Sequence, residues 1–357
     1  MIFRSRRKKN SAAPVATIER EAGDGLLPAD DFKSIEGLFG EIQRLSLLNR
    51  ENRDPELERR ILRLRHWAGA RMLSEPALDP QLVEAGGKLP STNGTGLPEV
   101  DAQDLTAQLL RAGIEQNGCL LVRGLVDRSQ AMRLADDIDR SFEARISQQQ
   151  GGEAPAALYE EFEPDAPFEM LGERGWIQEG GGVLAADSPK LAFDMLDTFE
   201  RIGLRQVLTD YLGERPAISA QKCTLRKAEP QVTGAWHQDG KFLGDVRAMN
   251  VWLSLSRCGD EAPGLDLVPR RLEGLVPAGT EGTWLSYQVS DETAAEAAGG
   301  VERIIRPIFE PGDVLLFDEL FLHQTGSDPE MPKPRYAVES WFFGPSAFPD
   351  EYVPLAA

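Results

Sequence analysis

The sequence predicts an α+β fold in which helices dominate the first part of the chain and short strands dominate the last part. Two observations support this prediction. Apolar residues recur at helical spacing in several segments before residue 213, whereas short alternating or β-branched runs separated by turn residues follow residue 217. Many short strands at this spacing are typical of a sandwich or a jelly-roll barrel.

Composition and charge narrow the class of protein. The 357 residues include 41% hydrophobic and 27% charged residues, as in ordinary globular proteins. The formal net charge of −19 argues against a nucleic-acid partner, which would need surplus Lys and Arg. No run of about 18 apolar residues exists, so no membrane partner is expected. The three cysteines lack CxxC spacing, which favours a reducing compartment and predicts a cytoplasmic location.

The first 75 residues divide into a tail and two helices. Residues 1–30 are polar, include the basic run "RSRRKK", and are expected to be a disordered tail. Residues 31–75 predict a helical hairpin, whose second helix begins at Asp54 and Pro55 as N-cap and first-turn proline. His66 in this helix is interpreted as a packing or surface residue. Three roles are open to the hairpin: capping the barrel, forming a homo-oligomer, or docking a carrier protein.

A linker and a large domain follow. Residues 76–104 are dense in Pro, Gly, Ser and Asn and predict a linker, so the main domain is expected over 105–357. The first half of this domain is predicted to contain a helix, a buried strand "CLLVRGL" and a second helix capped by Asp127. The glycine-rich segment "GERGWIQEGGG" at 172–182, with Trp176, is a candidate lid or a passive loop. A helical stretch is then expected over 189–212.

The strand-rich part supplies the barrel. In "RAMNVWLSLSR", Met249, Val251 and Leu253 alternate with Asn250 and Trp252, as in a strand with two distinct faces. The predicted strands are "AISAQKCTLRKA", "RAMNVWLSLSR", "GLDLVP", "TWLSYQV", "VERIIRPIF", "DVLLFD" and "RYAVESWFF".

Two of the three histidines lie in this strand-rich part. His237 stands two residues before Asp239 in "TGAWHQDGKF", and side chains two apart in an extended segment point to the same side. His323 ends a strand in "PGDVLLFDELFLHQTG", after enough strands for the chain to cross a barrel and return. Two histidines and one carboxylate hold non-haem Fe(II) while leaving positions open. The alternative interpretation is that both histidines are satisfied core or surface residues.

An arginine follows the second histidine. Arg335 starts the strand "RYAVESWFF", and a guanidinium fixed near a metal can hold a dicarboxylate through paired, charge-assisted hydrogen bonds. The order "HQD", "GDVLLFDELFLHQTG", "PRYAVESWFF" resembles the phytanoyl-CoA dioxygenase-like family of Fe(II)/2-oxoglutarate-dependent oxygenases. "GCLLVRGLVDRSQAMRLADDID" is similar to the segment that opens that family's domain. The resemblance spans roughly residues 105–345 and implies a double-stranded β-helix, a jelly-roll or cupin-like core with flanking helices.

The resemblance also implies a cofactor set and a site. It implies that Fe(II) and the cosubstrate 2-oxoglutarate are used with O2, and that ascorbate can stimulate turnover. The residues that it implies are His237, Asp239 and His323 for iron, Arg335 for the distal carboxylate of 2-oxoglutarate, and Trp252 and Gln221 along the cosubstrate pocket.

The sequence departs from the family's pattern at two places. The segment "EAPGLDLVPRRLEG" replaces the usual Asn-Gly turn and "PGSH" segment, so the rim of the site is remodelled. Position 337 is Ala, so a hydroxyl that assists Arg335 must come from elsewhere, with Thr325 and Tyr336 as the candidates. These departures make substrate inference from relatives unsafe.

The implied reaction is hydroxylation of an unactivated C–H bond in a small-molecule substrate, with release of succinate and CO2. Desaturation, cyclisation and epimerisation stay open as other outcomes on the same site, whereas halogenation is disfavoured because Asp239 is present. From other classes, a non-catalytic binding barrel and a cupin-like metal-dependent isomerase are alternatives. Retention of all three ligands together with Arg335 argues against the first, and Arg335 argues against the second. Four basic residues are candidate anchors for an anionic substrate or are simply solvated: Lys222, Arg226, Lys241 and Arg247.

Overall fold

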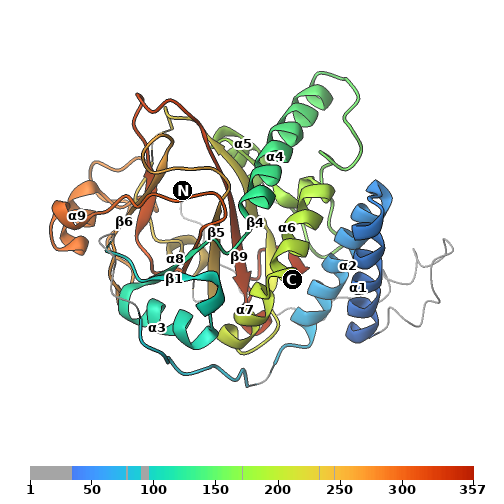
Figure 1. Cartoon of the computed structure of the whole chain (residues 1–357), viewed down its shortest axis with the longest axis horizontal. Coiled ribbons are helices and arrows are strands. Elements are labelled where there is room, and N and C mark those ends of the chain that lie inside the picture. The colour runs from blue at the N-terminus through green and yellow to red at the C-terminus, as the bar shows by residue number, and fades with distance from the viewer. Residues whose placement is uncertain (1–33, 78, 90–95, 171, 233, 245) are drawn as a thin grey trace.

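The structure is a computed structural model that describes residues 34–77, 79–89, 96–170, 172–232, 234–244 and 246–357. The tail predicted over residues 1–30 lies outside these ranges. Figure 1 shows a body of strands on one side of the molecule and a stack of helices on the other. The predicted α+β fold with a jelly-roll core is confirmed. None of the helices in the described ranges combines the length and apolar character needed to cross a bilayer.

Two sheets form the core. The main sheet has eight strands in the order β1-β2-β7-β5-β9-β4-β10, with β3 paired to β4, and only the β1–β2 pair is parallel. The small antiparallel sheet contains β6 (Gly264–Leu267) and β8 (His323–Gly326). The main-sheet strands are β1 (Glu99–Asp101), β2 (Cys119–Arg123), β3 (Gly182–Leu184), β4 (Ala217–Ala228), β5 (Ala248–Ser254), β7 (Val314–Phe317), β9 (Arg335–Phe343) and β10 (Pro354–Ala356).

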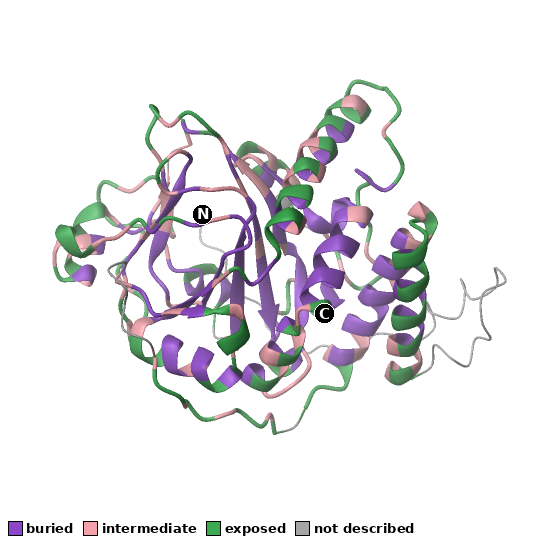
Figure 2. Cartoon of the chain, in the orientation of Figure 1, coloured by how far each residue is buried: buried purple, intermediate pink, exposed green. Residues whose placement is uncertain are grey.

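The two faces of the main sheet pack into different clusters. Val251 of β5 belongs to the cluster under the helices, whereas its neighbour Trp252 belongs to the cluster that includes Leu265 and Leu267 of β6. Successive side chains of a strand point to opposite faces, so one face meets the helices and the other meets the small sheet. Burial on both faces explains why the strands are nearly continuously purple in Figure 2. The alternation predicted for residues 249–253 is therefore correct, with both faces buried.

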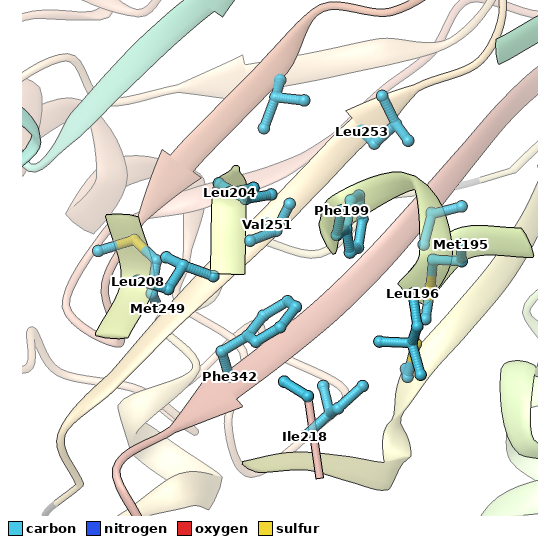
Figure 3. Packing of buried hydrophobic residues seen from close by; sticks show 14 of the residues in the cluster. Met195, Leu196, Phe199, Leu204, Leu208, Ile218, Met249, Val251, Leu253 and Phe342 are labelled. Atoms are coloured by element: carbon cyan, nitrogen blue, oxygen red, sulfur yellow. The ribbon is translucent and has the colours of Figure 1, made fainter. Parts of the chain in front are cut away.

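Helices cover the outer face of the main sheet. Figure 3 shows Phe199 and Leu204 packing near Val251 and Phe342 of the central strands. The helical stretch predicted over 189–212 is divided at Gly203, which adopts a left-handed φ of 77° between two helices. The helices of this layer are α3 (Ala107–Asn117), α4 (Arg128–Gln149), α6 (Pro189–Arg201) and α7 (Leu204–Leu212).

Two N-terminal helices extend this layer. They are α1 (Ile35–Glu51) and α2 (Pro55–Ser74), and α2 packs against α6 and β10 (Figure 1). The Asp54 side chain accepts a hydrogen bond from the amide of Glu56, as expected of an N-cap. His66 is buried: its Nδ1 donates to the Pro354 carbonyl at 3.0 Å, and its Nε2 accepts from the Asp165 amide at 3.1 Å. Both ring nitrogens have structural partners, so His66 is a packing residue.

Several segments differ from the sequence-based expectations. The last residues of the expected linker form β1, and residues 172–182 contain the helix α5 (Glu173–Glu179) rather than a plain loop. Residues 283–289 were expected to form a strand, but only Val289 makes a β-bridge, with Trp236, and Trp284 is 94% exposed. The remaining short elements are α8 (Gly240–Leu243), α9 (Asp291–Ala298) and the 3-10 turns Ala102–Asp104, Ala185–Asp187, Val301–Arg303 and Pro345–Ala347.

Candidate metal centre

The two strand-region histidines lie side by side on adjacent backbones. His237 precedes α8, and His323 is the first residue of β8. Their backbones form an antiparallel bridge in which the His237 amide donates to the His323 carbonyl at 3.0 Å and the reverse bond is 3.1 Å. The ring centroids are 4.4 Å apart. The backbone pairing therefore brings together two imidazoles that are 86 residues apart in the chain.

Both imidazoles are held in the same tautomer. Nδ1 of His237 lies 2.7 Å from the Ala235 carbonyl, and Nδ1 of His323 lies 3.0 Å from the Phe321 carbonyl. A carbonyl oxygen only accepts, so Nδ1 carries the hydrogen in each ring. In the neutral form of a ring held in this way, Nε2 carries a free lone pair, and this is the form that binds a metal ion.

The carboxylate reaches the histidines from a turn. Asp239 has φ −63° and ψ −25°, so it adopts a helical conformation at the start of α8 instead of the extended one expected from the sequence. Its Oδ1 still lies 3.5 Å from Nε2 of His237. One potential ligand atom from each of His237, Asp239 and His323 lies within 4.8 Å of the other two. The predicted trio therefore converges, although the local geometry differs.

The trio fits a cation. The Asp239 side chain is 6% exposed, and within the described ranges no hydrogen bond reaches its carboxylate. A buried carboxylate without such partners is costly unless a positive charge balances it. Burial, together with the nearby His237, lowers the pKa of His323 to about 4, against a smaller opposing effect of Asp239. The His323 ring is thus neutral at neutral pH and cannot supply that positive charge itself. Two imidazoles and one carboxylate are a donor set suited to Fe(II).

A cavity of about 720 Å³ opens beside the trio. The inner faces of β4, β5 and β9 form one wall, β6 and β8 contribute to the other, and residues of α5 lie along it. Such a volume accommodates a cosubstrate and a small molecule together. Seven of the sequence-predicted residues besides the trio line it: Trp176, Gln221, Lys222, Arg226, Trp252, Thr325 and Arg335.

Arg335 is a buried cation in this cavity. It is 1% exposed, its Nη1 donates to the Gly264 carbonyl at 2.9 Å, and its Nε has no partner in the described part of the chain. No carboxylate of a described residue lies within 4.0 Å of it. Its guanidinium lies over the Trp252 ring at 5.5 Å, and the buried Trp252 Nε1 likewise lacks a partner among the described residues. These unsatisfied donors fit an anionic ligand such as 2-oxoglutarate.

Gln221 is held by structural contacts. Its Oε1 accepts from the Val353 amide at 2.7 Å, and its Nε2 donates to the Glu169 carbonyl at 3.4 Å. It lies where the register of β4 shifts against β9, between Ile218 and Cys223. Its amide is therefore already used to fasten neighbouring segments, and its part in cosubstrate binding stays a prediction.

The remaining sequence-predicted residues divide into those that line the cavity and those that do not. Thr325 lines the cavity, whereas the Tyr336 hydroxyl donates to Asp139 at 2.7 Å and belongs to the helical side of the sheet. Thr325 is thus the better placed of the two hydroxyls considered for Arg335. Of the four candidate anion anchors, Lys222 and Arg226 line the cavity, Arg247 is paired with Glu214, and Lys241 does not line the cavity.

Sequence reasoning missed several cavity residues, and three of them are polar or lie close to the trio. Phe242 and Tyr287 lie near the His237 ring, with centroid distances of 6.4 and 6.3 Å. Glu339 lies on the inner face of β9 and pairs with Arg226 at 3.2 Å. Burial raises the pKa of Glu339, but Arg226 and Arg335 outweigh this effect and hold the pKa below its usual value. The available signal was the position of Glu339 four residues after Arg335, hence on the same face of the strand.

Fold and site together define a class: a double-stranded β-helix protein with two histidines and one carboxylate gathered beside an internal cavity. Comparison with known proteins finds no matching family model and no matching curated protein.

Among solved structures, this chain is similar to EctD from S. alaskensis, solved with 2-oxoglutarate and 5-hydroxyectoine. The identity is 19%, the match covers 75% of this chain and 82% of that chain, and the TM-score is 0.47. It is also similar to AviO1 from Streptomyces viridochromogenes Tue57, with 19% identity, 66% and 94% coverage and a TM-score of 0.43. A third is SnoK, described as a non-heme alpha ketoglutarate dependent carbocyclase from nogalamycin biosynthesis, with 14% identity, 69% and 86% coverage and a TM-score of 0.44. These likenesses concern the fold, and the assignment of the site rests on its own geometry.

Proposed function

We propose that this protein is an Fe(II)- and 2-oxoglutarate-dependent dioxygenase that hydroxylates an unactivated C–H bond of a small molecule and releases succinate and CO2. One observation carries the proposal: the unpartnered donor atoms of His237, Asp239 and His323 converge beside a cavity that also contains the buried, incompletely satisfied Arg335. A metal trio alone suits many functions. The trio together with a buried guanidinium suits a metal that works with a dicarboxylate.

Each residue has a defined role in this proposal. His237, Asp239 and His323 hold the iron, and the carbonyls of Ala235 and Phe321 fix the two ring orientations. The bound iron and 2-oxoglutarate supply oxidative decarboxylation coupled to oxygen insertion.

The cosubstrate is oriented by donors on the main sheet. Arg335 binds the distal carboxylate through its guanidinium, and the Gly264 carbonyl and the Trp252 ring keep that guanidinium in place. Trp252 Nε1 offers a further donor to the same ligand. The apolar rings of Phe317 and Trp341 on the cavity wall limit the access of water to the reacting groups.

Succinate release tests the proposal. Wild-type protein incubated with Fe(II), ascorbate and 2-oxoglutarate is expected to form succinate, and His237→Ala is expected to abolish it. Arg335→Gln is expected to raise the KM for 2-oxoglutarate by about a hundredfold, since two charge-assisted hydrogen bonds are lost. Glu261→Gln, at an exposed ion pair with Lys333, is the control. Succinate formation that survives loss of the first histidine would contradict the proposal.

The product decides among oxidative outcomes. A screen of a metabolite extract by mass spectrometry for a +16 product that depends on 2-oxoglutarate identifies hydroxylation, whereas a −2 product identifies desaturation or cyclisation. Absence of succinate together with tight metal binding would favour the alternative of a non-catalytic, cupin-like barrel.

A further inference from the structure

The inner face of the main sheet carries a carboxylate to which the proposed function gives no role. Glu339 lies in the middle of β9, opposite Thr224 of β4 on one side and Trp252 of β5 on the other. Its side chain lines the cavity that contains the metal-binding trio. A carboxylate on the inner wall of a barrel is costly, so its partners decide what it does.

Glu339 has spare hydrogen-bonding capacity. Its Oε2 accepts from Arg226 Nε at 3.2 Å, and no described residue donates to its Oε1. An ionised carboxylate can accept about four hydrogen bonds, so most of its capacity is unused. The Glu339 side chain is 27% exposed, and it lines the cavity, so the unused oxygen is accessible from there.

We propose that Glu339 recognises the substrate by accepting a hydrogen bond from an amine or hydroxyl group. The inference rests on the proposed function, because it assigns a substrate-binding residue in the cavity that is proposed to hold iron and 2-oxoglutarate. The substrate class that follows is a small molecule that carries at least one such donor. A carboxylate or another anion at this point would be repelled by Glu339.

The charges around the cavity agree with a donor group at Glu339. Iron and dianionic 2-oxoglutarate cancel each other in formal charge, so the residues decide the balance. Three cations and three carboxylates line the cavity, and their formal charges also cancel: Lys222, Arg226 and Arg335 against Glu179, Asp239 and Glu339. With no net charge to attract an ion from a distance, selection depends on local hydrogen bonds, and a desolvated charge-assisted bond is a strong one.

Arg226 links this recognition to the cavity mouth. Its Nε binds Glu339, and its Nη1 donates to the Gly180 carbonyl at 3.0 Å, directly after α5. The same guanidinium thus connects the recognising carboxylate to the helix that carries Trp176 at the cavity edge. A donor bound at Glu339 keeps this connection intact, whereas an anion would compete with Glu339 for Arg226.

A binding series of four six-membered-ring compounds that differ in their functional group tests the role assigned to Glu339. The probes are cyclohexylamine, cyclohexanol, cyclohexanone and cyclohexanecarboxylate, titrated by calorimetry into protein loaded with Mn(II) and 2-oxoglutarate. The wild type is expected to bind the amine and the alcohol about tenfold more tightly than the ketone, and the carboxylate most weakly. Equal affinity for the amine and the ketone, or no binding of either, overturns the proposal.

Substitutions of Glu339 distinguish a role in substrate recognition from a purely structural ion pair with Arg226. Glu339→Ala is expected to remove the preference for donors and, by freeing Arg226, to strengthen carboxylate binding by about tenfold. Glu339→Gln keeps the volume and one acceptor, so the alcohol is expected to bind as in the wild type while the amine loses its advantage. Glu261→Gln, which alters an exposed carboxylate, is expected to match the wild type. If Glu339 serves only to balance Arg226, the preference for donors survives in both Glu339 variants, and the proposal fails.

The two proposals fail separately. A wild type that releases succinate but shows no donor preference rejects the role of Glu339 and leaves the proposed function standing. A wild type that shows the preference, lost in Glu339→Ala, but releases no succinate rejects the proposed function alone.

Discussion

At the scale of single residues, the candidate metal centre is distinguished by side-chain acceptors to which no described residue donates a hydrogen bond. Asp239 is buried without a hydrogen-bond donor among the described residues, and both neighbouring imidazoles direct their hydrogens to backbone carbonyls. The region therefore presents acceptors without donors, which in a folded protein is the signature of a cation site.

Asp239→Asn tests that signature directly. The substitution keeps the shape of the side chain and removes its charge, so Mn(II) affinity is expected to fall by about a hundredfold or more. Equilibrium dialysis measures the change without any dependence on turnover. Asp210→Asn, at an exposed aspartate of α7, is the control. Unchanged Mn(II) affinity in Asp239→Asn would mean that the carboxylate is not a ligand.

The residues of the site were largely predictable because their chemistry is rare in this chain. Only three histidines occur, and two of them lie in strand-rich sequence with an aspartate and an arginine at suitable places. Glu339 was not predicted, because glutamate is common. Its spacing from Arg335 indicates the shared strand face, but the neighbours of that face depend on the register of β9 against β4 and β5. The 3.0 Å bridge that joins His237 to His323 also depends on long-range register, which local patterns do not encode.

At the scale of elements, α5 lies along the cavity and is anchored near both of its ends. Arg174 binds Asp187 at 2.9 Å near the start of the helix, and Arg226 binds the Gly180 carbonyl after its end. Trp176 lies between these two anchors, lines the cavity and is 52% exposed. The helix is thus fixed at both ends and presents a large ring at the mouth.

Trp176→Ala is expected to admit water and loosen the substrate, which raises the ratio of succinate to hydroxylated product. The ratio can be measured with the metabolite extract described above. Trp284 provides a matched control, because it is 94% exposed and does not line the cavity. An identical ratio in Trp176→Ala and Trp284→Ala would mean that α5 does not help to close the cavity.

The contact of α2 with the C-terminal region predicts a pH effect. Burial lowers the pKa of His66 below its model-compound value of 6.5, with weaker opposing effects of Pro354 and Asp165. The unfolded chain then takes up the proton first, so this group's stabilising contribution is complete above about pH 6.5 and decreases as the pH falls. The slope attributable to His66 is at most about 1.4 kcal/mol per pH unit. Urea unfolding of wild type and His66→Gln between pH 7.5 and 5.5 measures it, and equal slopes would contradict the assignment.

Local patterns predicted most elements of the fold and misassigned a few. The helix stripes and the alternation in β5 were reliable because each follows one repeating period. The segment 283–289 alternates in the same way, yet Gly279 and Gly282 before it adopt φ values of 68° and 88°, and the chain turns back on itself. The alternating pattern there has no sheet to join, and Trp284 remains exposed.

At the scale of the whole molecule, the main sheet separates the helical layer from the cavity. Phe342 lies on its outer face, 1% exposed, and contacts Phe199 at a ring-centroid distance of 6.0 Å. Arg335, Glu339 and Trp341, on the opposite face of β9, line the cavity. This strand therefore combines core packing with part of the cavity wall, whereas the metal-binding trio lies on β8 and beside α8.

Phe342→Ala is expected to lower the free energy of unfolding by about 3–5 kcal/mol, because it leaves a cavity between the helices and the sheet. Chemical denaturation measures the loss. Phe242→Ala, at a half-exposed phenylalanine of α8, is expected to cost far less. Comparable losses in the two variants would contradict the central role of the outer face.

The paired backbone bonds between His237 and His323 have a consequence for the proposed binding of a metal ion. The spacing of the imidazoles is set by main-chain pairing, so we expect it to be in place before an ion arrives and to persist after the ion leaves. Stripping with a chelator should then leave the barrel folded and let activity return at once on reloading, with no slow refolding phase. Under the proposed function, the supply of iron alone would then set how much of the folded protein is active.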